Sequence, residues 1–361
     1  MENGIENQIN NDLIKCPKTE DTTNISNIYY MNNLLKEKCK EFDEKYELLT
    51  SIKSGSAGVI YKGRLRNKKY TGKYLAFKFL FNKKDKDKDK DKNKELSIHG
   101  RLKHKHIPIV FNYCKILNSS CILMEYTKYG DLENFKRNVI KSACLSETLI
   151  CYLAGGILDA LYYIHVNNKI IHMDVKQQNI LIDDFLTVKL TDFSVSINYK
   201  NAKDYINLPL VGTSYYMSPE VLNKKRIAVT EASKIDIYSC GVLLYLLAFG
   251  YYPYNLNEVK NKDYSKIAKS VAENELKFPQ GTGHSKLFIN FIKNCLDKDI
   301  NKRYNIYQAM NDPWIKGYQI ILDEKEKLFY ANEFIVNLML SNLINFNKYN
   351  KDKDENVKEN L

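Results

Sequence analysis

The chain has 361 residues, 44% of them hydrophobic, which is enough to bury the core of one large two-lobed domain or of two domains. The formal net charge is +12. This charge favours either plain solubility or attraction to an acidic substrate or surface, and composition leaves both open. We expect no membrane span, because no stretch of about 18 apolar residues stands out.

The cysteines indicate a reducing compartment. The eight of them contain no CxxC pair, which disfavours a metal knuckle. The polar, Asn- and Glu-rich start predicts no signal peptide. We therefore expect reduced thiols and a cytoplasmic location, with the nucleus as the alternative.

The first half of the chain shows mainly strand signals. Residues 1–43 form a polar extension, which we expect to be irregular up to Tyr29 and helical over 30–45. Apolar runs flanking a Gly-containing turn predict a hairpin over 48–61. Further strands are expected over 74–81, 109–117 and 121–126.

A charged insert interrupts these strands. Residues 83–94 nearly alternate Asp and Lys, a composition that cannot bury a core. We expect a solvated insert or a frayed helix start, with a docking role as the alternative. Glu95–Lys103 follows as a helix.

The second half is helical. Apolar-rich helices are expected over 145–166, 234–249 and 285–296. In the C-terminal extension, 319–361, the stretch 329–346 predicts a helix that docks on the larger half or binds a partner. The last residues, 348–361, are charged, and we expect them to be disordered.

The most informative motif has two parts, which flank two short apolar runs, 180–182 and 188–190, that we expect to be strands. Asp174, Lys176 and Asn179 sit in one short run, and Asp192-Phe193-Ser194 begins thirteen residues after Asn179. Phosphoryl transfer from ATP needs a base to orient a hydroxyl, a cation for the moving phosphate and oxygen ligands for Mg²⁺. This run supplies all three.

The order and spacing of these residues resemble the catalytic loop and metal-binding triplet of eukaryotic protein kinases. The resemblance implies an α+β, bilobal protein kinase fold over 44–318. Its N-lobe (44–126) would be small and β-rich with one main helix, and its C-lobe (127–318) would be larger and α-helical. Lys176, two residues after Asp174, resembles the serine/threonine type, with no clear subfamily.

The same resemblance assigns a nucleotide site. Lys53 to Ile60 resembles the glycine-rich loop, where backbone amides close over phosphates. Met124 would be the gatekeeper, the hinge after it would bind adenine, and Asp131 would reach the ribose. The full set of nucleotide contacts is Ile52, Gly55, Gly58, Ile60, Ala76, Lys78, Met124, Glu125, Tyr126, Thr127, Asp131, Leu181 and Asp192.

Catalytic roles are carried over in the same way. Asp174 would orient the substrate hydroxyl, and Lys176 would neutralise charge on the γ-phosphate. Lys78 would pair with Glu95, because an unpaired buried ammonium is costly. Asn179 and Asp192 would hold Mg²⁺, or Mn²⁺ as the alternative. Structural support would come from Thr213, Asp236 and the pair Glu220–Arg303.

The resemblance implies an ATP- and Mg²⁺-dependent serine/threonine kinase whose partners are ATP and protein substrates; we expect no nucleic acid. Three positions depart from the family pattern: Lys53 replaces a glycine, Met173 an arginine and Ser194 a glycine. They leave open a pseudokinase-like nucleotide-binding scaffold. A third reading is an ATP-binding interaction module that acts through the basic insert and tail.

Overall fold

The computed structural model describes residues 21–54, 58–66, 74–80, 89–116, 119–254 and 263–318, with backbone only for 21–27 and 89–93. Gly55, the first half of the Asp-Lys insert (83–88) and the extension 319–361 lie outside the described residues. The chain divides into two compact units. The first, here called the N-lobe, comprises Met1–His104 and Pro108–Thr127, and the second, the C-lobe, comprises Lys105–Ile107 and Lys128–Leu361.

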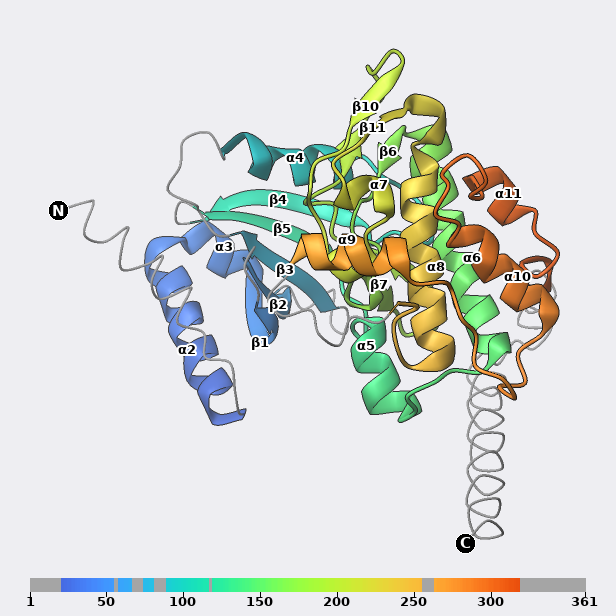
Figure 1. Cartoon of the computed structure of the whole chain (residues 1–361). Coiled ribbons are helices and arrows are strands. Elements are labelled where there is room, and N and C mark those ends of the chain that lie inside the picture. Colours follow the sequence, from blue (N-terminus) through green and yellow to red (C-terminus); the bar gives the residue numbers. More distant parts are fainter. Residues whose placement is uncertain are drawn as a thin grey trace, which may run out of the picture. The chain divides into compact units, whose positions relative to one another are not determined.

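An antiparallel sheet is the centre of the N-lobe. Over the described residues it has five strands in the order β1-β2-β3-β5-β4 (Figure 1). The strands are β1 (Tyr46–Ser54), β2 (Gly58–Leu65), β3 (Tyr74–Leu80), β4 (Val110–Ile116) and β5 (Ser119–Glu125). Each begins and ends within a few residues of an expected strand, because each is an apolar run bounded by polar or glycine-containing turns.

The two faces of this sheet carry different clusters of buried side chains. One face, here called the back face, packs a cluster that includes Leu48, Val59, Phe77, Phe79, Cys121 and Leu123. The other, the front face, carries a smaller cluster of Ala76, Leu80, Ile122 and Met124. Lys78 lies on the front face, because side chains alternate along β3.

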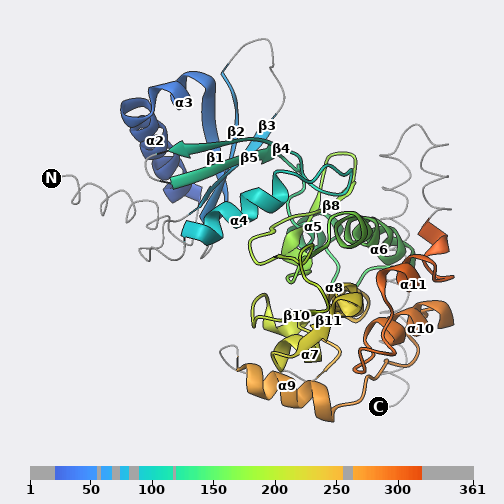
Figure 2. The same ribbon diagram turned by 90° about the horizontal axis from the view of Figure 1, so that it is seen from above.

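A helical extension covers the back face. Helices α2 (Asp21–Lys38) and α3 (Lys40–Lys45) precede β1, and α2 contacts that strand (Figure 2). Met31 and Leu35 of α2 are buried in the back-face cluster. The expected helical stretch over 30–45 is present, but as the end of α2 and the whole of α3, with a break at Cys39. The expected irregular chain is wrong for 21–29, because α2 already begins at Asp21, and residues 1–20 lie outside the described residues. The few apolar residues in this segment were too weak a signal to predict the full length of α2.

Helix α4 (Asp89–His99) is the main helix inserted between the N-lobe strands. It ends four residues before the expected limit at Lys103, because the chain turns at Gly100, where the Leu102 N–H already bonds the carbonyl of His99. Its first residues come from the charged insert, in agreement with the helix-start reading of that segment.

The C-lobe is mainly helical. Its helices are α5 (Leu132–Phe135), α6 (Glu147–Tyr162), α7 (Pro219–Leu222), α8 (Ser233–Phe249), α9 (Tyr264–Glu273), α10 (Lys286–Cys295) and α11 (Ile306–Met310). Every residue of α8 is buried, and α8 contacts α6, α10 and α11 (Figure 2). A helix that is apolar on all sides lies inside a lobe, so α8 is the central element of this unit.

Short strand pairs and single turns carry the loops of the C-lobe. The pairs are β6 (Ile170–Ile171) with β9 (Ile197–Asn198), β7 (Ile180–Ile182) with β8 (Val188–Leu190), and β10 (Tyr205–Asn207) with β11 (Arg226–Ala228). The helical turns are Lys136–Ile140, Tyr163–Asn167, Gln177–Asn179, Ser214–Tyr216 and Val229–Glu231.

Two of the described helical stretches, Glu147–Asn167 and Val229–Phe249, are long and apolar enough to cross a bilayer by length and composition. The expectation that no such stretch exists is therefore wrong. Their most apolar windows are 78% and 100% buried within the protein. Buried core helices pass the same test, so the two stretches are weak evidence for a membrane span.

Candidate active site

Lys78 and Glu95 form a buried ion pair in the N-lobe. The Nζ atom of Lys78 lies 2.6 Å from Oε1 of Glu95, and the two side chains are 9% and 4% exposed. Strand β3 directs Lys78 to the front face, and α4 supplies the carboxylate. The expected pairing is confirmed. It satisfies both charges, each of which would be costly to bury alone.

The front face also gathers several predicted nucleotide contacts. Ala76 and Met124 are cross-strand neighbours, and Ile60 packs against the same cluster. Ile52 lies on β1 with its side chain exposed. Gly58 has a structural reason of its own: a Cβ built there would meet the Phe79 carbonyl oxygen at 2.0 Å, so β2 can approach β3 only without a side chain.

The predicted hinge begins at Glu125, the last residue of β5. The Glu125 N–H donates to the Ile109 carbonyl over 2.9 Å, and the Glu125 carboxylate accepts the Ile109 N–H over 3.2 Å. These two bonds hold the end of β5 in place. Tyr126 is partly exposed and Thr127 is buried. Their adenine contacts remain predictions.

Asp131 and Leu181 meet in the C-lobe through an isolated antiparallel bridge. The Oδ1 atom of Asp131 accepts the Asn134 N–H over 3.0 Å and so caps the start of α5. This cap is a role that the sequence analysis did not assign. The ribose contact remains a prediction.

Asp174 is the centre of a compact polar network in the loop after β6. Its Oδ2 atom lies 2.7 Å from Nζ of Lys176. The Asn179 amide nitrogen donates to Oδ2 over 2.9 Å and to the Asp174 carbonyl over 2.8 Å. The three residues predicted from one short run therefore converge on a single carboxylate.

Thr213 closes the network from the other side. Lys176 donates to Thr213 Oγ1 over 2.7 Å, and the Thr213 N–H donates to Asp174 Oδ1 over 2.8 Å. The predicted bridge between Asp174 and Lys176 is thus confirmed. Gly212 permits the approach, since its φ is +102° and a Cβ there would lie 2.4 Å from the Met173 carbonyl oxygen.

Asn179 and Asp192 offer oxygen donors of the kind that Mg²⁺ prefers. Because the Asn179 amide nitrogen faces Asp174, its Oδ1 is the atom that can face a cation. The Thr191 N–H bonds the Asn179 carbonyl over 3.0 Å, which brings the segment of Asp192 beside the loop. These donors fit a Mg²⁺ ion that takes its other ligands from phosphates and water. Among the described residues no group of three or more His, Cys, Asp or Glu side chains can hold a metal.

Asp236 braces the loop that carries Asp174 from within α8. It accepts the backbone N–H groups of His172 (2.6 Å) and Met173 (2.9 Å), as predicted, and it lies 2.8 Å from Nε2 of His165. Burial opposes ionisation of this carboxyl, but the hydrogen bond and charge of His165, together with His172, bring the pKa of Asp236 below its ordinary value. The brace holds Met173 at φ +71°, a left-handed conformation that costs energy outside glycine.

His165 and His172 support this loop through contacts that the sequence analysis missed. The His172 ring packs against Phe193 with centroids 5.0 Å apart, and its Nε2 lies 3.0 Å from the Thr191 carbonyl. Its place two residues before Asp174 was the available signal. His165 lies 71 residues from Asp236 and carries no comparable signal.

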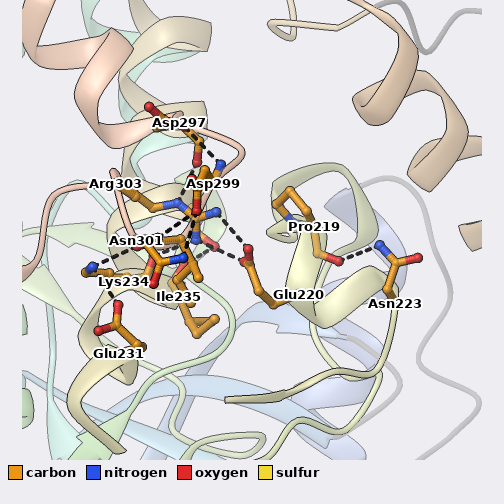
Figure 3. A network of polar contacts seen from close by, with 12 residues as sticks. Pro219, Glu220, Asn223, Glu231, Lys234, Ile235, Asp297, Asp299, Asn301 and Arg303 are labelled. Atoms are coloured by element: carbon orange, nitrogen blue, oxygen red, sulfur yellow. Dashed lines mark hydrogen bonds and ion pairs between the residues drawn. The ribbon is translucent and has the colours of Figure 1, made fainter. Parts of the chain in front are cut away.

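Glu220 and Arg303 form another buried ion pair (Figure 3). Two Arg303 nitrogens lie 3.0 and 3.1 Å from the two carboxylate oxygens of Glu220. Arg303 also donates to the carbonyls of Asp297 (2.8 Å) and Lys234 (3.2 Å). The predicted pair is confirmed. It ties α7, directly after the Thr213 segment, to the loop before α11.

Comparison with known proteins agrees with this geometry. The family model of the protein kinase domain matches residues 46–315. The chain is 30% identical to serine/threonine-protein kinase TIO of Arabidopsis thaliana over 78% of its length and 20% of that protein. It is 30% identical to CBL-interacting serine/threonine-protein kinase 14 of the same plant, over 80% of this chain and 61% of that protein. It is 29% identical to mitogen-activated protein kinase kinase 2 of Arabidopsis thaliana, over 75% of this chain and 72% of that protein.

The chain thus spans about a fifth of the length of TIO and about three fifths of the length of CBL-interacting kinase 14. The matched range is 46–315, and the expected limits of the domain, 44–318, stay a prediction. The family match covers most of the chain, and the confirmed ion pairs and loop contacts lie inside it. The chain therefore belongs to the eukaryotic protein kinase family.

Proposed function

We propose that this protein is an active kinase that transfers the γ-phosphate of ATP to serine and threonine hydroxyls of protein substrates. The observation that carries the proposal is the network around Asp174. Its contacts with Lys176, Asn179 and Thr213 keep a base and a cation side by side. A phosphotransferase needs that pairing where the hydroxyl attacks.

Each residue then has a defined task. Asp174 orients the attacking hydroxyl and accepts its proton, while Lys176 offsets charge that develops on the transferred group. Lys78, held by Glu95, binds the phosphates of ATP, and front-face residues such as Ala76 and Met124 contact the purine. Asn179 and Asp192 would hold Mg²⁺, or Mn²⁺, which when bound would neutralise charge on the phosphates.

Two observations favour serine and threonine acceptors over tyrosine. Lys176 stands two residues after Asp174, as in the serine/threonine type. Relatives such as TIO and CBL-interacting kinase 14 carry serine/threonine-protein kinase in their names. That the whole protein acts on protein substrates is likewise a proposal.

Radiolabelled ATP and a generic serine/threonine protein substrate test the proposal. Wild type should incorporate label in the presence of Mg²⁺, and Asp174→Asn should lose most incorporation because the base is gone. The exposed Asp184→Asn is the matched control and should behave as wild type. Equal incorporation by wild type and Asp174→Asn would overturn the proposal.

A pseudokinase-like scaffold is the second candidate. Lys53 and Ser194 stand where the family carries glycines, and these two departures favour it. A scaffold would bind ATP without turnover. Saturable binding of a fluorescent ATP analogue, with no more label transfer by wild type than by Asp174→Asn, would support it.

A further inference from the structure

Two cysteines lie directly opposite each other in the N-lobe sheet. The register of β4 against β5 pairs Cys114 with Cys121, next to Tyr113 with Ile122 and Lys115 with Ser120. Directly opposed residues of an antiparallel pair have Cα atoms about 4.5 or 5.5 Å apart. Disulfides span Cα separations of about 4.4–6.8 Å, so either value meets the requirement.

The side chains of both cysteines point to the back face. Cys121 is fully buried in the back-face cluster, and the partly buried Cys114 packs against it. The Cys114 thiol donates to the Cys121 carbonyl with a sulfur–oxygen distance of 3.9 Å. Their shared face is what allows the two sulfur atoms to meet.

Cys114 is also accessible. Strand β4 is an edge of the sheet, and Cys114 lines a cavity of about 240 Å³ together with Cys39, Phe42, Lys45 and Tyr46. A small oxidant can therefore reach one sulfur of the pair, while the second stays in the core.

The two thiols differ in pKa and therefore in reactivity. A hydrogen bond from the Cys121 side chain lowers the pKa of Cys114 below its ordinary value, against the opposing effect of burial. Burial, together with that hydrogen bond, raises the pKa of Cys121 well above its ordinary value. Because the thiolate is the nucleophile, Cys114 is the first sulfur to react and Cys121 the resolving thiol.

We propose that Cys114 and Cys121 are an oxidative modification site, which hydrogen peroxide closes into a reversible cross-strand disulfide. The inference concerns the N-lobe alone and does not depend on the proposed kinase activity.

The reaction balances in two steps. The Cys114 thiolate attacks one peroxide oxygen, an S–O bond forms, the O–O bond breaks, and hydroxide leaves as water after taking a proton. The Cys121 sulfur then attacks the sulfur of the Cys114 sulfenic acid, which breaks the S–O bond and releases water that carries the Cys121 proton. Overall, two thiols and one peroxide become one disulfide and two waters.

The bond would fix the edge strand β4 to β5. Strand β5 carries Met124 on its opposite face and ends at the predicted hinge residue Glu125. Oxidation thus acts on the strand that bears predicted nucleotide contacts.

The chain is well suited to a direct test, because trypsin cleaves after Lys115 and so separates the two cysteines. Reduced full-length protein is treated with hydrogen peroxide, alkylated and digested without reductant. We expect a disulfide-linked pair of peptides, 106–115 with 116–128, that disappears on reduction. Cys39 lies in its own short peptide, so a link to it would be recognised.

Variants separate the roles of the two sulfurs. Cys121→Ala should lose the linked pair and accumulate a sulfenic acid at Cys114 that dimedone traps, whereas Cys39→Ser should keep the linked pair. Cys144, a partly buried thiol whose pKa burial raises, is the internal control and should react more slowly. The proposal is overturned if wild-type Cys114 and Cys121 remain separately alkylated, if Cys114 links to Cys39, or if Cys144 oxidises as fast as Cys114.

Discussion

Lys78 and Asp192 are the two charged residues that the proposed function assigns to the phosphates of ATP and the metal ion. Lys78→Met and Asp192→Asn should each lower kcat by ~10²-fold or more, because each removes a charge that stabilises the transferring group. Label transfer from ATP at saturating Mg²⁺ measures the effect. A variant that keeps the wild-type kcat would show that its residue has no such role.

Lys78→Met needs a control for folding, because it leaves the Glu95 carboxylate buried at 4% exposure without this ammonium. The double variant Lys78→Met/Glu95→Gln removes that charge as well. It should recover thermal stability but not activity. Recovered activity would mean that Lys78 acts only through the fold.

At the scale of elements, α2 extends the N-lobe core beyond the matched family range. Asn32 donates to the Leu48 carbonyl over 2.8 Å and accepts the Leu48 N–H over 3.3 Å. Leu48 lies at an irregularity in the pairing of β1 with β2. One amide side chain thus satisfies a backbone donor and acceptor there.

Leu35→Ala should lower the free energy of unfolding by about 2–5 kcal/mol, because it removes a side chain that is 1% exposed and leaves a cavity. Chemical denaturation of the full chain measures this loss. Tyr29→Ala, at a position 71% exposed on the same helix, should change stability little. Similar effects of both substitutions would mean that α2 does not dock on the sheet.

The segment from Asp192 to Glu220 is the second element with a testable property. Kinases with arginine before the catalytic aspartate use it to grip a phosphate on this segment. Here Met173 is uncharged and buried. The segment is held instead by β6 with β9, by β10 with β11, and by a 3.1 Å bond from Ser196 to the His172 carbonyl.

We therefore expect basal activity to be independent of phosphate on this segment. Of the candidate acceptors, Ser196, Tyr199 and Ser214 are buried, whereas Tyr205 is 54% exposed with the Arg226 guanidinium 4.3 Å from its ring centroid. Phosphatase-treated protein, checked by mass spectrometry, should keep most of its kcat. A drop in kcat of about ten-fold or more after phosphatase treatment, restored by autophosphorylation, would contradict this expectation. If phosphatase treatment caused no such drop in Tyr205→Phe, the switch would lie at Tyr205.

The stability of the whole molecule should depend on pH through His284. Its side chain is 9% exposed, packs against the rings of Phe249 and Phe288, and lies 3.6 Å from Glu147. Burial lowers the pKa of His284 below its ordinary value of 6.5, although Glu147 acts in the opposite direction. The unfolded chain therefore binds a proton near that pH which the folded protein does not, so stability falls as pH drops below 6.5.

Denaturation midpoints at several pH values between neutral and mildly acidic measure this effect. Wild type should lose stability over the range, and His284→Gln should lose less, since it has no group to protonate. Equal slopes for the two proteins would assign the pH dependence to other groups.

Local patterns predicted much of the fold. Strand β3 and helix α8 are rich in apolar residues, and both were expected within a few residues of their observed bounds. Helix α9 was not predicted, because only Ile267 and Val271 of its ten residues are buried. The start of α2 was missed for a similar reason, since few apolar side chains mark its polar sequence.

The sequence by itself determined the family and the grouping of Asp174, Lys176 and Asn179, because these residues lie within one short run whose spacing is the signal. Only the tertiary structure decided which distant groups support them: His165 reaches Asp236 across 71 residues. It also decided the opposition of Cys114 and Cys121, which follows from the register of two strands. The physical reason is that register and long-range packing depend on how many side chains fit together at once, and no local pattern carries that information.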